Sequence, residues 1–118
     1  MTADGWILVV DDDDDIRETV TMLLELNGYR AFGASDGIKA LEEMERRGRP
    51  AGVLLDLRMP HMNGAELARA MRADPSLASV PIVVLSGDAA GSDVPPAAAV
   101  LRKPCGVDQL LAVVAKHM

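Results

Sequence analysis

Four apolar runs in the sequence are each followed directly by polar residues that could take part in chemistry. ILVV is followed by Asp11 and Asp12, GVLL by Asp56, IVVL by Ser86, and AVLR by Lys103. If these runs are parallel strands of one sheet, their carboxyl ends lie at one edge, where open α/β sheets bind ligands. The sequence would then bring carboxylates, a hydroxyl and an amine together in one site.

The charges of these side chains indicate the ligands that such a site would suit. Neighbouring carboxylates repel one another unless a cation neutralises them. All-oxygen ligation with few protein ligands suits Mg²⁺, so we expect Asp11 and Asp12 to hold this ion. Lys103 and Ser86 could neutralise and hydrogen-bond a phosphoryl group. Asp56, alone at the end of its run, is the expected nucleophile toward phosphorus.

The apolar runs have the pattern of buried parallel strands. They are continuous rather than alternating with polar residues, and they are rich in β-branched side chains, which is typical of strands covered on both faces. The sequence predicts strands at Ile7–Val10, Gly52–Leu55 and Ile82–Leu85 and, from a weaker pattern, at Tyr29–Phe32 and Ala99–Arg102.

Between these strands, apolar residues recur with helical spacing. The spacing i, i+4, i+7, i+8 predicts a helix over Ile16–Leu26, which Asn27-Gly28 would end. Ser35 is the expected N-cap of a second helix, and two more helices are expected at 65–72 and near residue 110. The expected inward-facing side chains are Ile16, Val20, Leu23 and Leu24, then Ile38, Leu41 and Met44, and finally Val107, Leu110, Leu111 and Val114.

Alternating strands and helices predict an α/β fold, a doubly wound five-stranded parallel sheet of the (βα)₅ type. Residues 86–99 fit the alternation poorly, because two glycines and Pro95-Pro96 oppose a long helix there. We therefore expect a shortened or irregular fourth helix. The sequence shows no repeat or linker, so residues 1–118 are expected to form one domain.

The composition argues against several classes of function. The chain is 49% hydrophobic and 25% charged, as in globular domains. Its net charge of −6 argues against nucleic-acid binding, which needs clustered Lys and Arg. No apolar run approaches the roughly 20 residues that span a bilayer, and the single cysteine cannot form an internal disulfide. We expect a cytoplasmic domain that contacts neither nucleic acid nor membrane.

Over essentially its whole length the chain resembles the response regulator receiver domain, a CheY-like domain of bacterial two-component signalling. The motifs that carry the resemblance are ILVVDDD with Asp11-Asp12, VLLDLRMPHMNG with Asp56, Pro60 and Gly64, IVVLSG with Ser86, and LRKP with Lys103-Pro104.

The resemblance implies a flavodoxin-like fold and a role in a phosphorelay. Asp56 would take a phosphoryl group from a phosphohistidine on a sensor histidine kinase or a histidine phosphotransfer protein. This step would be self-catalysed, so we do not expect an enzyme with a free substrate. Asp12 and Asp56 would ligate Mg²⁺ directly with the backbone carbonyl of Arg58, and Asp11 would act mainly through water.

The resemblance also implies how phosphorylation would be read. Ser86 would rotate to hydrogen-bond the phosphoryl oxygen, and Lys103 would pair with it. Relatives that signal through their own fold usually carry Tyr or Phe three residues before the lysine, where this chain has Val100. The usual aromatic readout is therefore not expected. Because the sequence contains no DNA-binding or catalytic output domain, the signal would pass to a partner protein, or to the rest of a longer chain if this domain is part of one.

Two other functions remain open from the sequence alone. A haloacid-dehalogenase-like Mg²⁺-dependent phosphatase would use Asp11 as nucleophile and Asp13 as acid, although it would leave Asp56 unexplained. A pseudo-receiver that is never phosphorylated would need none of the acidic residues that this chain retains. We expect Asp13, Asp14 and Asp15 to lead into the first helix, whose dipole favours negative charge, rather than to bind metal.

Overall fold

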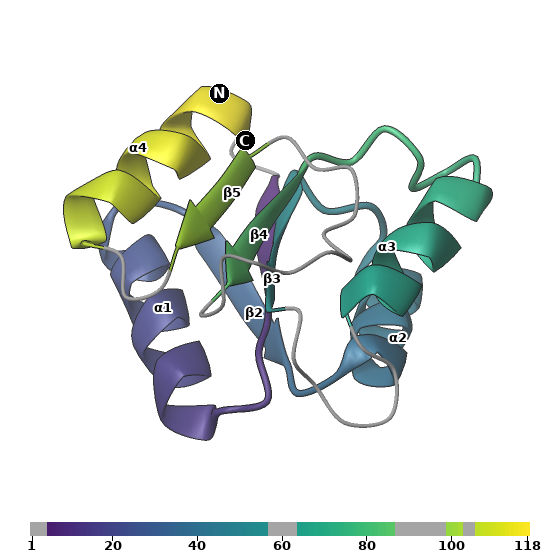
Figure 1. The fold of residues 1–118 in the computed structure, drawn as a ribbon, viewed down its shortest axis with the longest axis horizontal. Helices are drawn as coiled ribbons and strands as arrows, with labels where there is room; N and C mark the ends of the chain where they lie inside the picture. Colours follow the sequence, from purple (N-terminus) through teal and green to yellow (C-terminus); the bar gives the residue numbers. More distant parts are fainter. Residues whose placement is uncertain (1–4, 57–63, 87–98, 103–105) are drawn as a thin grey trace.

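The five strands of the computed structural model are all parallel and form one sheet in the order β2-β1-β3-β4-β5 (Figure 1). The structure describes residues 5–56, 64–86, 99–102 and 106–118. The strands are β1 (Trp6–Val10), β2 (Arg30–Ala34), β3 (Gly52–Asp56), β4 (Ile82–Ser86) and β5 (Ala99–Arg102). All five predicted strands are therefore present, and β2 begins and ends slightly later than expected.

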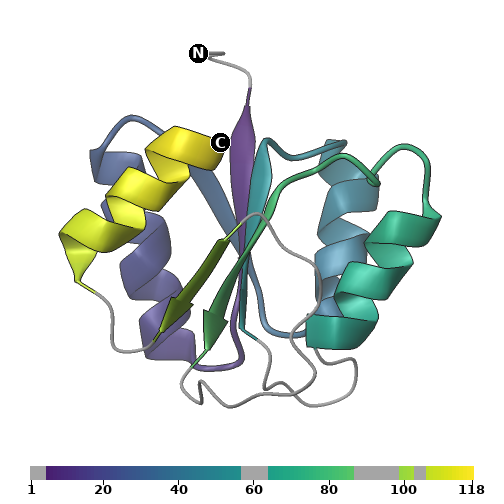
Figure 2. The ribbon, with the colours of Figure 1, turned by 45° about the horizontal axis from the view of Figure 1, so that its top comes forward.

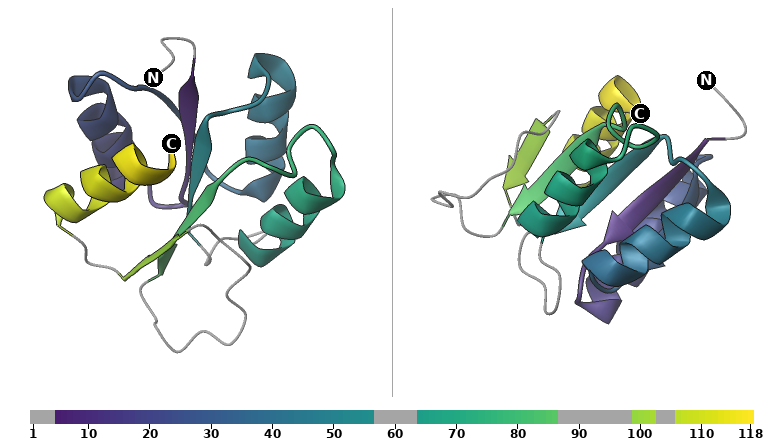
Figure 3. Two further views of the ribbon diagram at one scale, coloured as in Figure 1. Left: turned by 90° about the horizontal axis from the view of Figure 1, so that it is seen from above. Right: turned by 90° about the vertical axis from the view of Figure 1, so that its right-hand side faces the viewer.

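The helices lie in two layers, one on each face of the sheet. In the described part of the chain they are α1 (Asp14–Leu26), α2 (Gly37–Arg47), α3 (Gly64–Ala73) and α4 (Val107–His117). Helices α1 and α4 cover one face and α2 and α3 cover the other (Figures 2 and 3). This confirms the predicted doubly wound α/β fold. The expected short helix between β4 and β5 would fall in residues 87–98, outside the described residues, so it stays a prediction.

The continuous apolar runs are explained by cores on both faces of the sheet. In β1, Leu8 and Val10 pack into the core under α2 and α3, whereas Ile7 and Val9 pack into the core under α1 and α4. Because successive side chains of a strand point to opposite faces, a strand between two helix layers has no position for a polar residue. Strands β1 and β3 are accordingly buried along their whole length.

The second helix begins differently from the prediction. Its N-cap is Asp36 rather than Ser35, because the Asp36 carboxylate accepts a hydrogen bond from the backbone N–H of Lys39 at 2.9 Å. With this start, Ala40 and Met44 face the core, whereas Ile38 is 48% exposed and was wrongly expected to be buried.

Two further side chains that were expected to face inward are exposed. Ile16 is 38% exposed and Val107 is 47% exposed. Both lie in the first turn of their helices, α1 and α4. The spacing of apolar residues predicts each helix, but it does not predict which residues of the first turn are covered by the sheet.

Within the described residues, none of the helices combines the length and hydrophobicity that crossing a bilayer requires.

Two leucines of α1 provide a matched test of how this helix packs on the sheet. Leu24 is 0% exposed and Leu26 is 75% exposed. We expect Leu24→Ala to lower the free energy of unfolding by about 2–5 kcal/mol, since it leaves a cavity in the core under α1 and α4. Leu26→Ala should change it by less than about 0.5 kcal/mol. Chemical denaturation followed by circular dichroism measures both, and equal losses would contradict the observed orientation of α1.

Candidate functional site

The carboxyl ends of the parallel strands meet at one edge of the sheet. Val10 is paired with Leu55, so that Asp11 leaves β1 at the level of Asp56, the last residue of β3. Asp56 is in turn paired with Leu85, one residue before the end of β4. The register of the sheet therefore places the acidic residues from two neighbouring strands side by side, as the sequence predicted.

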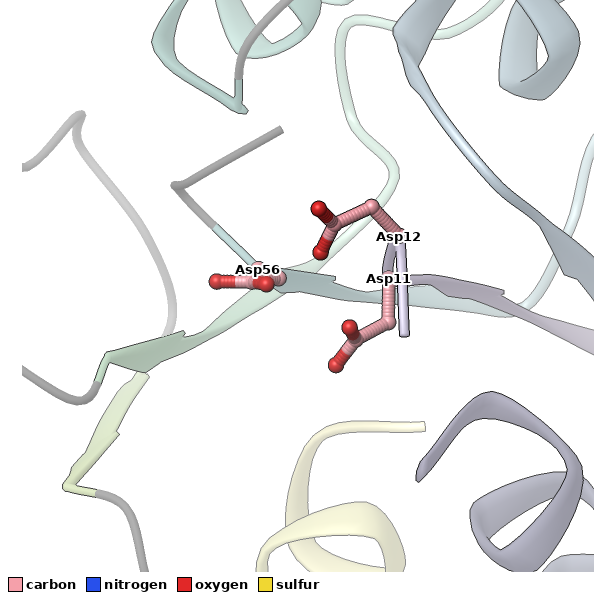
Figure 4. A group of neighbouring side chains, drawn as sticks. All are labelled: Asp11, Asp12 and Asp56. Carbon is pink, nitrogen blue, oxygen red and sulfur yellow. The ribbon is translucent and has the colours of Figure 1, made fainter. Parts of the chain in front are cut away.

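Three carboxylates form a cluster at this edge. One carboxylate oxygen from each of Asp11, Asp12 and Asp56 lies within 4.8 Å of the others. Figure 4 shows Asp11 and Asp12 extending from the end of β1 toward the side where Asp56 ends β3. Asp11 is 2% exposed and Asp56 is 7% exposed, whereas Asp12 is exposed to solvent. The cluster is thus buried on one side and open on the other.

The remaining predicted site residues are described in part or not at all. Ser86 is the last residue of β4 and its backbone is paired with Arg102, the last residue of β5. Lys103 would follow directly at the same edge, but Lys103 and Arg58 both lie outside the described residues. Their expected roles therefore stay predictions.

Hydrogen bonds hold both the backbone and the side chain of Asp11. Its backbone N–H donates to the carbonyl oxygen of Ala34 in β2 at 3.1 Å. Its carbonyl oxygen accepts from Nη1 of Arg17 at 2.8 Å. Its carboxylate Oδ1 accepts from the backbone N–H of Asp13 at 2.9 Å. Backbone and side chain are therefore both fixed at the point where the chain leaves β1.

The three aspartates after the cluster serve the following helix. Asp13 is the N-cap of α1, and its Oδ1 accepts from the N–H groups of Asp15 at 3.0 Å and Ile16 at 3.1 Å. Asp14 and Asp15 lie in the first turn, where the helix dipole favours negative charge. Among the described residues, the carboxylate cluster that could hold a metal ion consists of Asp11, Asp12 and Asp56. This confirms the expectation that Asp13, Asp14 and Asp15 lead into the first helix, whereas metal binding by Asp11 and Asp12 stays a prediction.

One contact to the site was not found from the sequence. Arg17 bonds the Asp11 carbonyl from the first turns of α1, six residues further along the chain. Its side chain passes over Gly33 of β2, with Cγ and Cδ each 2.8 Å from the position that a Cβ of residue 33 would take. Gly33 directly follows the predicted strand Tyr29–Phe32, and a glycine at a strand often marks the close approach of another group, so this glycine is the signal that was available.

The donor set of the cluster fits a hard divalent cation. It offers carboxylate oxygens only, and one side is open for water or for a further ligand. Mg²⁺ binds through one or two carboxylates and keeps several waters, whereas zinc sites normally include nitrogen or sulfur ligands. Like charges at this separation repel one another, and a bound cation would offset that repulsion.

Comparison with known proteins agrees with this geometry. Residues 7–115 match the family model of the response regulator receiver domain. The chain belongs to this family and is a receiver domain of two-component signalling. Receiver domains are not enzymes in the ordinary sense.

A curated relative and two solved structures show the extent of the similarity. Response regulator MprA from Mycobacterium leprae is 40% identical over 117 residues, which cover 90% of this chain and 47% of that protein. The chain thus spans about half the length of the curated relative.

The structures are similar over nearly their whole length. A response regulator receiver protein from Pseudomonas putida has a TM-score of 0.88 at 32% identity, covering 98% of this chain and 99% of the other. The response regulator TrrA from Thermotoga maritima, solved in complex with Mg(2+)-BeF, has a TM-score of 0.86 at 31% identity, covering 97% and 99%. These similarities confirm the flavodoxin-like, CheY-like fold.

The repulsion within the cluster leads to a test by charge removal. Asp12→Asn removes one of the three charges with little change in shape, so we expect the metal-free protein to become more stable by about 1 kcal/mol. The same variant should gain less than the wild type when Mg²⁺ is added, because it has lost a ligand. Thermal unfolding with and without Mg²⁺ measures both effects.

Asp15→Asn is the matched control, since Asp15 belongs to the same acidic run but lies in the first turn of α1. It should lower the stability slightly, by about 0.3–1 kcal/mol, and leave the response to Mg²⁺ unchanged. If Asp12→Asn destabilised the metal-free protein as Asp15→Asn does, the cluster would not be a site of repulsion.

Proposed function

We propose that this chain is a phosphoacceptor in which Asp56 takes a phosphoryl group from the phosphohistidine of a sensor histidine kinase or a histidine phosphotransfer protein. The observation that carries this proposal is the three-carboxylate cluster at the carboxyl edge of the sheet in a chain of the receiver family. Residues 1–118 would form one receiver domain. Its chemistry would be its own phosphorylation and dephosphorylation.

Asp56 suits the role of nucleophile by its position. It ends β3, the central strand of the sheet, and is only 7% exposed, so its carboxylate has little freedom. An oxygen of this carboxylate would attack phosphorus while the phosphorus–nitrogen bond of the phosphohistidine breaks. The imidazole leaves with the electron pair of that bond, and the product is an acyl phosphate on Asp56.

Asp11, Asp12 and Asp56 would hold Mg²⁺, with the backbone carbonyl of Arg58 as a further protein ligand. When bound, the ion would neutralise the carboxylates and offset the charge on the transferring phosphoryl oxygens. The Mg(2+)-BeF complex of TrrA supports this assignment by similarity. Asp11 is almost fully buried and would line the buried side of the site, whereas Asp12 is exposed on its open side.

Ser86 and Lys103 are proposed to contact the phosphoryl group. Ser86 ends β4, the strand next to β3, and Lys103 follows the last residue of β5, which is paired with Ser86. These positions would be the next two along the edge that holds the cluster. A hydroxyl and an amine there would hydrogen-bond and neutralise phosphoryl oxygens.

The signal is proposed to pass to a partner protein through the surface near the site. Val100 stands in β5 where relatives usually have an aromatic ring, and it is 52% exposed on an edge strand. Phosphorylation adds about −1.5 to −2 charge, which can rearrange neighbouring loops without such a ring. The net charge of −6 argues against contact with nucleic acid, and the domain is proposed to work in the cytoplasm without contacting a membrane.

The haloacid-dehalogenase-like alternative is not supported. It would need Asp13 as a catalytic acid, but Asp13 caps α1 with its carboxylate, and the chain belongs to the receiver family.

Incubation with acetyl phosphate, followed by intact mass measurement, tests the proposal. The wild type should gain one base-labile phosphoryl group, and chelation of Mg²⁺ should slow this gain at least about tenfold, equivalent to about 1.4 kcal/mol of the barrier. Asp56→Asn should gain none. Asp13→Asn keeps an oxygen acceptor for the helix cap and should still be phosphorylated.

A base-labile phosphoryl group on the Asp56→Asn variant would show that another residue is the acceptor. A wild type that gains nothing, even from a cognate kinase, would instead support the pseudo-receiver hypothesis.

A further inference from the structure

We propose that Arg17 is a positioning residue for the metal site and acts through the backbone between Asp11 and Asp12. This inference rests on the proposed function, because it assumes that the carboxylate cluster binds Mg²⁺. It assigns a role to a side chain that touches neither the metal ligands' carboxylates nor the phosphoacceptor.

Arg17 makes two contacts that require its forked guanidinium. Nη1 donates to the carbonyl oxygen of Asp11 at 2.8 Å, and Nη2 forms an ion pair with the Asp14 carboxylate. The Arg17 side chain is only 19% exposed, whereas that of Asp14 is 77% exposed. The planar fork holds both partners at once, which a lysine with a single nitrogen cannot do in the same geometry.

The contact with Asp11 controls the direction in which the chain leaves β1. The Asp11 carbonyl belongs to the peptide group that joins Asp11 to Asp12. The peptide group before Asp11 is fixed as well, since the Asp11 N–H donates to Ala34 at 3.1 Å. With both peptide groups held, the backbone torsions of Asp11 are set. The carboxylates of Asp11 and Asp12 then start from defined positions on the same side as Asp56.

Gly33 provides the space through which Arg17 reaches this carbonyl. A Cβ at residue 33 would lie 2.8 Å from both Cγ and Cδ of Arg17, which is too close for either to stay in place. The stem of Arg17 thus lies directly on the backbone of β2. A larger residue at position 33 would displace Arg17 without altering its charge.

A displaced Arg17 would have room to move. A cavity of about 350 Å³ lies beside it, lined in part by Arg17, Gly33, Ser35, Lys39, Glu43 and Arg46. Arg46 borders this cavity too and forms an ion pair with Glu43 three residues away, much as Arg17 does with Asp14. Its guanidinium, however, bonds the Glu43 carboxylate rather than a residue of the metal site, so Arg46 is the control.

Titration of the purified, metal-free chain with Mg²⁺ by calorimetry tests the proposal. Arg17→Met keeps the apolar stem but loses both donors, and we expect its dissociation constant for Mg²⁺ to rise about tenfold or more, as for other residues that orient metal ligands. Gly33→Ala should produce a similar rise although Arg17 is intact. Arg46→Met should stay within about twofold of the wild type.

The double variant Gly33→Ala/Arg17→Met separates positioning from a general effect on stability. If Gly33 acts through Arg17, the second substitution adds nothing, and the double variant binds Mg²⁺ as Arg17→Met does. Unfolding curves recorded without metal identify a temperature at which every variant is folded, and the Mg²⁺ titrations are run at that temperature.

The results distinguish failure of this inference from failure of the proposed function. A wild type that binds Mg²⁺ and an Arg17→Met variant that binds it equally well would overturn the role of Arg17 alone. Independent, additive losses from the two substitutions would also overturn it, since Gly33 would then not act through Arg17. A wild type that binds no Mg²⁺ would overturn the proposed metal site itself, and this inference with it.

Discussion

Repulsion among three carboxylates governs what the carboxyl edge of this sheet can bind. Oxygens of Asp11, Asp12 and Asp56 lie within 4.8 Å of one another, and two of these side chains are almost fully buried. Strands packed on both faces cannot shift to relieve this repulsion, so the sheet holds the cluster in place. Asp11 is fixed further by hydrogen bonds of its N–H, its carbonyl and its carboxylate. A site built in this way favours the binding of a small cation, because the cation removes the repulsion that the fold imposes.

The five consecutive aspartates are tolerated because each finds a different partner. Asp11 and Asp12 belong to the cluster. Asp13 caps α1, Asp14 pairs with Arg17, and Asp15 lies in the first turn beside the positive end of the helix dipole. A run that composition alone would describe as a solvated acidic block is therefore the junction of the carboxylate cluster and a helix N-terminus. Arg17 connects the two halves, since it bonds both the Asp11 carbonyl and the Asp14 carboxylate.

The sequence predicted the elements of this fold well because burial on both faces leaves a direct trace, the continuous apolar run. The position of each polar residue after a run was enough to predict the cluster. Helix faces were predicted less well. Ser35 and Asp36 are both good capping residues, and only the structure shows that Asp36 bonds the Lys39 N–H. Arg17 escaped notice because its role depends on Gly33, which is distant in sequence and is brought beside it only by the packing of α1 on β2. The roles of Arg58 and Lys103 lie outside the described residues and stay predictions.

A crystal structure of the chain grown with Mg²⁺ and beryllium fluoride would show directly whether Asp56 is the phosphoacceptor and whether the carboxylate cluster binds Mg²⁺. We expect a fluoroberyllate group on the Asp56 carboxylate and one Mg²⁺ ion bonded to oxygens of Asp12 and Asp56 at about 2.0–2.1 Å. Beryllium on Asp11, or a carboxylate cluster without metal in crystals saturated with Mg²⁺, would contradict it.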